Sequence, residues 1–177
     1  MMIFTIFIIL IAIQRLVELY IAKQNEKQLK VAGAVEYGES HYRWMVLMHV
    51  SFFIVLIFEV TLFGRNVSAL WPIWLTLFLM AQSGRIWVIS SLGKHWNTKI
   101  IVVPNAEVVI KGPYKFFKHP NYIIVATEII VISLLFNAYL TAIIFTILNI
   151  WMMAVRIPLE EKALKENTEY SAVFKGK

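Results

Sequence analysis

A chain of 177 residues with 59% hydrophobic residues is richer in apolar residues than soluble domains, which hold roughly 45–50%. With only 16% charged residues as well, it is expected to be an integral membrane protein that forms a single domain, residues 1–177. The lack of cysteine excludes disulfides, thiolate zinc sites and cysteine nucleophiles. The net charge is +6, but the basic residues do not alternate with aromatic residues in the way expected of a nucleic-acid-binding groove. We therefore expect a lipid bilayer and not a nucleic acid as partner.

Five apolar stretches follow one another along the chain. In the first, residues 2–22, only Gln14, Arg15 and Glu18 are polar, and about 20 such residues suffice to cross the hydrocarbon core. We do not expect a cleaved signal peptide, because no basic residue precedes this stretch and no small-residue cleavage site follows it. The other stretches are residues 44–63, 70–92, 123–136 and 139–155, and the fourth reaches the length of a span only if it begins near Pro120.

The polar segments between these stretches carry weaker signals. Residues 93–122 form the one long segment that does not span, with β-like patches at 100–103 and 107–110 that predict a short hairpin. The tail from Arg156 onward is polar and expected to be helical up to Lys165. Pro158 suits the first turn of a new helix there, since proline lacks only an N–H that has no helical partner at that position.

The basic residues test the number of spans. Fourteen of the seventeen lie in residues 23–43, in residues 93–122 and in the tail, which five spans place on one side of the membrane. By the positive-inside rule this side is the cytoplasm. We therefore expect an all-α protein with five transmembrane helices, its N-terminus outside and its C-terminus in the cytoplasm.

Charged residues at membrane depth are costly and need a partner or a purpose. Arg15 and Glu18 are three residues apart and can pair on one helix face, for which we favour a structural role. Arg85 and Glu128 each suit one half of a buried pair between helices, and structural and functional readings stay open. We assign no role to Glu59. The spacing of the histidines matches no zinc motif, so no metal site is expected.

Two polar segments adjoin the apolar stretches and hold the candidate chemistry. Residues 111–122 combine lysines, prolines, aromatics and a histidine directly before the fourth stretch, and Arg156 with Glu160-Glu161 follows the fifth. Taken separately, each has a simpler interpretation. His119 suits a capping or packing role, and Arg156 suits an interfacial anchor before an amphipathic tail.

Together the two segments resemble the isoprenylcysteine carboxyl methyltransferase family of integral membrane methyltransferases. The resemblance covers about residues 80–172, which we take as the methyltransferase core, whereas residues 1–66 carry no motif of the family. The motifs that carry it are Ser91-Leu92-Gly93, Trp96, Gly112-Pro113-Tyr114, Lys118-His119-Pro120-Asn121-Tyr122, Arg156, Glu160-Glu161 and Ala163-Leu164.

The resemblance implies S-adenosylmethionine as methyl donor, in a cytoplasmic pocket formed by the C-terminal half. His119, Pro120 and Tyr122 would line this pocket, and Glu160 would hold polar groups of the cofactor. Tyr114 and Tyr122 can face the sulfonium, with cation–π attraction worth about 0.5–2 kcal/mol each.

The same resemblance implies that Arg156 and Glu161 are the catalytic pair, with Glu161 either fixing Arg156 or taking a proton from the acceptor. Two positions depart from the family. Lys118 replaces a usual arginine and lacks its bidentate geometry. Ile124 stands where a glycine is common, which leaves close helix packing at that point in question.

The expected function is methylation of an oxygen on a lipophilic molecule in a bacterial cytoplasmic membrane. Prenylcysteine-type carboxylates and hydroxyl groups of long-chain polyketides such as alkylpyrones are both compatible acceptors. Methylation of phospholipid amines is an alternative enzymatic function. A small transporter or membrane scaffold, with Arg85 and Glu128 as a polar relay, is the non-enzymatic alternative.

Overall fold

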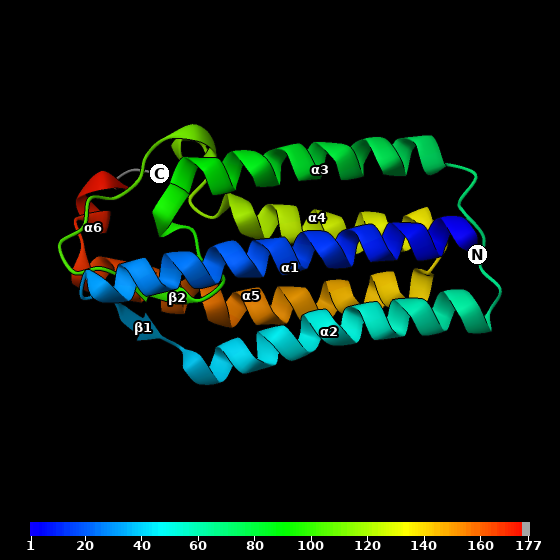
Figure 1. Ribbon diagram of the computed structural model, residues 1–177, viewed down its shortest axis with the longest axis horizontal. Coiled ribbons are helices and arrows are strands. Elements are labelled where there is room, and N and C mark those ends of the chain that lie inside the picture. Colours follow the sequence, from blue (N-terminus) through cyan, green and yellow to red (C-terminus); the bar gives the residue numbers. More distant parts are fainter. Residues whose placement is uncertain (175–177) are drawn as a thin grey trace.

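The computed structural model describes residues 1–174, and its long helices run side by side along one axis (Figure 1). These helices are α1 Met2–Val31, α2 Glu39–Leu62, α3 Trp71–Leu92, α4 Pro120–Leu135 and α5 Tyr139–Asn167. Each of them contains one of the five apolar stretches. Apart from two strands of three residues, the regular structure is helical, and the predicted all-α architecture is confirmed.

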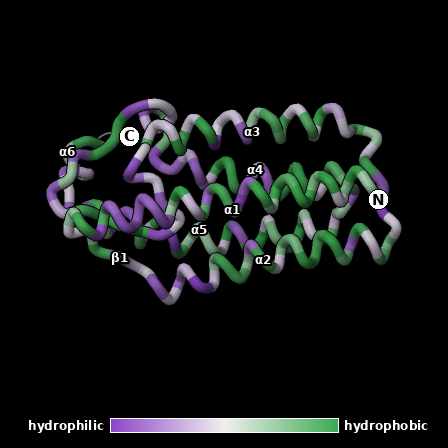
Figure 2. Tube along the Cα trace, viewed as in Figure 1, coloured by the Kyte–Doolittle hydropathy of each residue, from purple (hydrophilic) through white to green (hydrophobic). Residues whose placement is uncertain are grey.

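Four helices, α1, α2, α3 and α5, are long and apolar enough to cross a membrane. Figure 2 shows apolar residues along most of the bundle and polar residues gathered at the end that holds β1. Helix α4 begins at Pro120 and has only 16 residues. At 1.5 Å per residue it spans about 24 Å, less than the roughly 30 Å of a hydrocarbon core.

The short elements lie at one end of the bundle, opposite the N-terminus (Figure 1). They are β1 Val35–Tyr37, the 3₁₀ turns η1 Gly93–His95 and η2 Gly112–Lys115, β2 Ile100–Val102, and α6 Tyr170–Val173. Strands β1 and β2 pair antiparallel, with Val35 opposite Val102. The chain thus brings residues near 35, 100, 115 and 170 to the same end.

The predicted hairpin between residues 100–103 and 107–110 is wrong. Strand β2 pairs with β1 instead, and residues 107–110 form no strand. The physical reason is long-range packing: Ile100 and Val102 are buried against Ala163 of α5. A local β-like pattern cannot encode that contact.

Lys99, which precedes β2, connects three elements. Its ammonium lies 3.0 Å from Glu26 of α1 and 3.1 Å from Glu36 of β1. Burial by itself would lower the pKa of Lys99, but the two carboxylates raise it, so the side chain stays charged. Asn97 adds a hydrogen bond of 3.0 Å to the Ala22 carbonyl of α1. The start of β2 is therefore fixed to α1 and β1.

Helix α5 is continuous through Pro158, so the expectation of a new helix at that residue is wrong. Proline in a helix interior leaves the carbonyl four residues earlier without its helical donor, which costs about 3 kcal/mol. Packing of the turns after Pro158 offsets this cost. Leu159 lies against Gly38, and Ala163 is buried under β2.

Glu59, which has no role in the sequence analysis, caps the start of α5. Its carboxylate accepts hydrogen bonds from the backbone N–H of Leu140 at 3.2 Å and of Thr141 at 2.7 Å. A carboxylate at a helix N-terminus is favoured by the helix dipole and by the free N–H groups there. The tight turn at Asn137, which has φ 54°, places α5 beside this cap.

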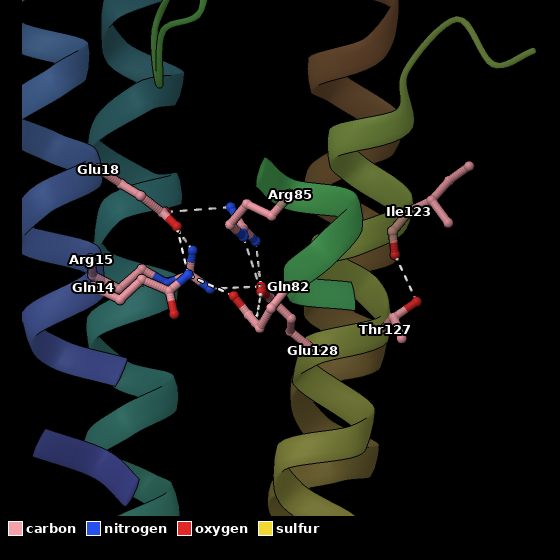
Figure 3. A network of polar contacts seen from close by, with 8 residues as sticks. All are labelled: Gln14, Arg15, Glu18, Gln82, Arg85, Ile123, Thr127 and Glu128. Carbon is pink, nitrogen blue, oxygen red and sulfur yellow. Dashed lines mark hydrogen bonds and ion pairs between the residues drawn. The ribbon is translucent and has the colours of Figure 1, made fainter. Parts of the chain in front are cut away.

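Buried charges at mid-bundle form one network that joins α1, α3 and α4 (Figure 3). Arg85 binds both carboxylate oxygens of Glu128, with 3.0 Å from Nε to Oε1. Arg15 donates to Glu18 and to Glu128, each at 2.6 Å. Arg85 also lies 3.4 Å from Glu18. The expected pairs of Arg15 with Glu18 and of Arg85 with a group on another helix are both confirmed.

Two glutamines complete this network. Gln14 donates to Glu18 at 2.8 Å and to Gln82 at 2.6 Å, and Gln82 donates to Glu128 at 2.7 Å. Two arginines therefore face two glutamates, and the set is electrically neutral. Such a network is favourable only when every charge has its partner, so removal of one member leaves an uncompensated charge in an apolar bundle.

We expect Glu128→Gln to destabilise the protein strongly, by about 3–5 kcal/mol, because Arg85 loses its carboxylate. The double variant Arg85→Met/Glu128→Gln restores neutrality and should be more stable than Glu128→Gln alone. Thermal unfolding in detergent measures both.

Thr127→Ala is the matched control on the same helix, since the Thr127 hydroxyl bonds only the Ile123 carbonyl of its own helix (Figure 3). It should change stability little. A double variant no more stable than Glu128→Gln would contradict the charge argument.

Candidate functional site

The start of α4 and the second half of α5 lie together at the end of the bundle that holds the strands. His119 occupies the position before α4, and Pro120 is its first residue, which suits proline because no N–H is needed there. Tyr122 follows in the first turn. Helix α5 supplies Arg156 and, one turn later, Glu160.

Direct contacts join the two halves of the motif. The Tyr122 hydroxyl donates a hydrogen bond to the Glu160 carboxylate and accepts one of 3.0 Å from Nε of Arg156. The His119 ring stacks on the Tyr122 ring at 5.4 Å, and its Nε2 lies 3.2 Å from Oε1 of Glu161. Five of the predicted site residues are thus within one cluster.

Arg156 is 5% exposed, and its guanidinium is held by neutral groups only. Nη2 donates to the carbonyl of Thr98 at 2.7 Å and Nε donates to the Tyr122 hydroxyl. No carboxylate within residues 1–174 forms an ion pair with Arg156. The suggestion that Glu161 fixes Arg156 is wrong, because Glu161 binds His119 and, at 2.8 Å, Lys165.

An arginine buried without a counter-ion is unusual, because desolvation of a charge costs several kcal/mol unless a partner offsets it. Nη1 of Arg156 has no hydrogen-bond partner in the part of the chain that the structure describes. The charge and the free N–H groups can therefore bind an anionic oxygen. This arrangement suits a ligand with a carboxylate, a phenolate or an enolate.

A cavity of about 170 Å³ adjoins this cluster. Its wall includes Tyr114, Lys118, Glu160 and Tyr170, together with the irregular segment that follows β2. The Tyr170 hydroxyl is buried and has no hydrogen-bond partner within residues 1–174. The cavity thus has a carboxylate, aromatic rings and an unpaired hydroxyl on its surface.

Burial raises the pKa of the Tyr114 hydroxyl well above its ordinary value, and the nearby Glu160 carboxylate acts in the same direction. Burial likewise raises the pKa of Tyr170 to about 12, with smaller contributions from Glu161 and Glu160. Both tyrosines therefore stay protonated at neutral pH. They can donate hydrogen bonds into the cavity.

Close packing of η2 on α3 holds Tyr114 at the cavity wall. Gly112 has φ +59°, and a Cβ atom there would lie 2.0 Å from Oγ and 3.0 Å from Cβ of Ser91. Only glycine fits this approach. Tyr114 then packs against a buried cluster that includes Trp96 and Ile124. Two motifs that are distant in sequence, at 91–93 and 112–114, therefore support each other.

The two departures from the family pattern have local explanations. The Lys118 ammonium lies over the Phe174 ring at 6.0 Å and contributes to the cavity wall. Ile124 faces Gly84 of α3, where a Cβ atom would be 3.4 Å from Cδ1 of Ile124. The glycine that permits close helix packing here is on α3 instead of α4.

Some residues of the cluster gave no sequence signal. Thr98 contributes its main-chain carbonyl, which no side-chain pattern marks. Tyr170 lies beyond Lys165, where the predicted tail helix ended. Within residues 1–174, no group of three or more histidine, aspartate or glutamate side chains lies close enough together to hold a metal ion.

Comparison with known proteins agrees with this geometry. The sequence model of the isoprenylcysteine carboxyl methyltransferase (ICMT) family matches residues 74–166, more than half of the chain and all of the Arg156 cluster except Tyr170. The chain belongs to this family. The ICMT family is one of membrane methyltransferases, so the resemblance seen in the motifs is confirmed.

Two bacterial relatives match over most of their length. The uncharacterized protein YpbQ of Bacillus subtilis strain 168 is 47% identical over 163 residues, which cover 92% of this chain and 97% of YpbQ. An uncharacterized protein of Haemophilus influenzae is 29% identical over 151 residues, which cover 85% of this chain and 88% of that protein. No solved structure matches the chain.

We expect Gly112→Ala to destabilise η2 and weaken cofactor binding, because a methyl group would displace Ser91. Gly64→Ala is the matched control, since Gly64 has φ +57° but nothing within 4 Å of a Cβ atom. The control carries only the backbone strain, about 1–2 kcal/mol. Gly112→Ala should cost about 1–3 kcal/mol more.

Unfolding in detergent and calorimetric binding of S-adenosylmethionine measure the two effects of Gly112→Ala. Equal losses of stability in Gly112→Ala and Gly64→Ala would contradict the role assigned to close packing at Ser91.

Proposed function

We propose that the protein is an S-adenosylmethionine-dependent methyltransferase that methylates an anionic or acidic oxygen of a lipophilic acceptor. The observation that carries this proposal is the buried Arg156, which lacks a counter-ion and is linked through the Tyr122 hydroxyl to Glu160 on the wall of a cavity. Membership of the ICMT family supports the reaction class.

The cavity has side chains that suit S-adenosylmethionine. Glu160 can accept hydrogen bonds from ribose hydroxyls or from an ammonium group, and the unpaired Tyr170 hydroxyl can donate one. The aromatic faces of Tyr114 and Phe174 suit an adenine ring or a sulfonium. When bound, the cofactor would supply an electrophilic methyl group on that sulfonium. At about 170 Å³ the cavity is smaller than the roughly 300 Å³ of typical ligand pockets, so it would hold only part of the cofactor.

The chain's own residues have separate roles in this proposal. Arg156 orients the acceptor and binds its negative oxygen. Tyr122 links Arg156 to Glu160, so the acceptor and cofactor sides of the site share one hydrogen-bonded bridge. Glu161 acts through His119, which it holds by a hydrogen bond, instead of through Arg156. His119 in turn stacks on Tyr122.

Two observations support this proposal over the alternative functions. A cationic or amine head group would be repelled by Arg156, which disfavours phospholipid amine methylation. A prenylcysteine-type carboxylate and an acidic hydroxyl of a polyketide such as an alkylpyrone both suit it. The polar relay needed for a transporter is disfavoured as well, because Arg85 and Glu128 form an ion pair with each other and Glu128 also binds Arg15.

For the topology, we propose five spans in a bacterial cytoplasmic membrane, with the N-terminus outside and the site in the cytoplasmic leaflet. The distribution of basic residues supports this orientation. The apolar surface of the helices lets an acceptor approach from the bilayer. The cofactor would enter from the cytoplasm.

The direct test incubates purified protein with methyl-labelled S-adenosylmethionine and a cell lipid extract, and identifies labelled lipids by mass spectrometry. We expect label in a lipid that bears a new methyl ester or methyl ether. Calorimetry should show cofactor binding without lipid. Folded protein that neither binds the cofactor nor transfers label would refute the proposal.

Variants of the site should separate binding from turnover. Arg156→Ala should lower the transfer rate by about 10²–10³, as expected for loss of a donor to a reacting oxygen. Glu161→Ala should lower turnover as well. Glu160→Ala and His119→Ala should mainly weaken cofactor binding, by about tenfold or more, which corresponds to about 1.4 kcal/mol.

Lys162→Ala is the control for these variants, because Lys162 is on the same turn but its side chain is 73% exposed and pairs only with Glu166. It should leave binding and transfer unchanged. Near-normal transfer by Arg156→Ala would refute the role given to Arg156.

A further inference from the structure

The first turn of α2 lies directly against α5 beside the buried guanidinium. Gly38, which precedes α2, is so close that a Cβ atom there would lie 2.4 Å from Cδ2 of Leu159. The hydroxyls of Tyr42 and Thr98 are 3.2 Å apart, and Thr98 is the residue whose carbonyl holds the guanidinium. His41 belongs to the same turn, between these two contacts.

His41 is half-buried, and its ring lies close enough to Arg156 for the arginine charge to act on it. Neither ring nitrogen is accessible to solvent, and neither has a partner among residues 1–174. The Met152 carbonyl of α5 lies beside the ring but outside normal hydrogen-bond geometry, and the charge of Arg156 acts on the ring. Buried polar atoms almost always have partners. Two unpartnered histidine nitrogens near an arginine without a counter-ion therefore point to a ligand that binds both.

We propose that His41 belongs to the acceptor site and takes the proton from a hydroxyl group of the methyl acceptor, while Arg156 binds the resulting oxyanion. This inference rests on the proposed function and narrows its substrate class. The acceptor is then a lipophilic molecule that ends in an acidic hydroxyl, a phenol or an enol.

In the proposed step, the acceptor O–H bond breaks, its proton moves to the unprotonated nitrogen of the neutral His41 ring, and its electron pair stays on oxygen. That oxygen forms the new O–CH₃ bond, the S–CH₃ bond of the cofactor breaks, and the electron pair of this bond remains on sulfur. His41 afterwards releases its proton to water.

A carboxylate acceptor would make no use of this histidine. Carboxylic acids with a pKa of about 4 are already ionised at neutral pH, so they need a cation but no base. A hydroxyl acceptor needs both groups. The pairing of Arg156 with an unpartnered imidazole therefore favours the hydroxyl over the carboxylate.

The charges around His41 agree with this role. Arg156 approaches the ring from α5, and Lys99 lies 5.7 Å from the centre of the neighbouring Tyr42 ring but is paired with two glutamates. In the part of the chain that the structure describes, no carboxylate forms an ion pair with His41. When His41 is protonated, its positive charge would therefore be compensated by the oxyanion of the acceptor.

The first test measures transfer by His41→Gln and His41→Asn, which keep a polar side chain that cannot take a proton. The probe is methyl-labelled S-adenosylmethionine with the cell lipid extract as the source of acceptor. We expect a loss of about 100-fold or more in rate, the lower end of the range for general-base catalysis, with cofactor affinity within about threefold of wild type.

The second test needs no cofactor. A 4-nitrophenol that carries a long alkyl chain reports its own ionisation, because the phenolate absorbs visible light and the phenol does not. At a pH about one unit below the pKa of the free phenol, the probe bound to wild-type protein should be mainly ionised. Bound to either His41 variant, it should be ionised to a clearly smaller extent, because Arg156 then favours the phenolate without a base to take the proton.

His49→Gln is the matched control, because His49 is two turns deeper on α2 and its Nδ1 already lies 2.7 Å from the Met45 carbonyl. His49→Gln should keep the wild-type transfer rate and the wild-type ionisation of the bound phenol. Transfer by a folded His41 variant above about one third of the wild-type rate, or equal phenol ionisation in variant and wild type, would overturn the role of His41 and leave the proposed function intact. Absence of transfer by folded wild-type protein would remove the proposed function and this inference together.

Discussion

Compensation of buried charge is the constraint on which the architecture of this protein depends. At mid-bundle, Arg15 and Arg85 are matched by Glu18 and Glu128, and two glutamines fill the remaining hydrogen-bond positions. This neutral set joins three helices to one another, and each of its charges has a partner of opposite sign. Arg156 is buried to a similar degree but has only neutral partners. An uncompensated charge gains most from an incoming anion, so the Arg156 cluster is the candidate binding site, whereas the neutral set is structural.

The position of Arg156 follows from how the chain is connected. Helix α4 begins inside the motif at Pro120, and the tight turn at Asn137 with the Glu59 cap returns the chain along α5. Because α5 has 29 residues and α4 only 16, α5 extends beyond the start of α4 and places Glu160 and Glu161 over His119 and Tyr122. The cluster can form because α5 is longer than the adjacent α4 and its additional turns lie over the start of α4.

Local signals in the sequence were sufficient for the helices and for most of the cluster. Apolar stretches located all five helices, and the motif residues around His119 and Arg156 do lie together. The errors share a cause. The pairing of β2 with β1, the continuation of α5 through Pro158 and the separation of Glu161 from Arg156 all depend on contacts between distant segments. Glu59 and Thr98 act on backbone groups of other elements, which a pattern of side chains does not reveal.

The N-terminal half, which carries no motif, nevertheless contributes to the site. Strand β1 pairs with β2, and this pairing positions Thr98 under the Arg156 guanidinium. The turn after β1 then presents His41 to the same guanidinium, since Gly38 allows α2 to begin in contact with Leu159. The cavity that we propose for the cofactor is lined only by residues from Leu92 onward. A side of the site that includes α2 can instead select the acceptor. If the C-terminal half binds the cofactor and the N-terminal half helps to bind the acceptor, related chains could bind the same cofactor and methylate different acceptors.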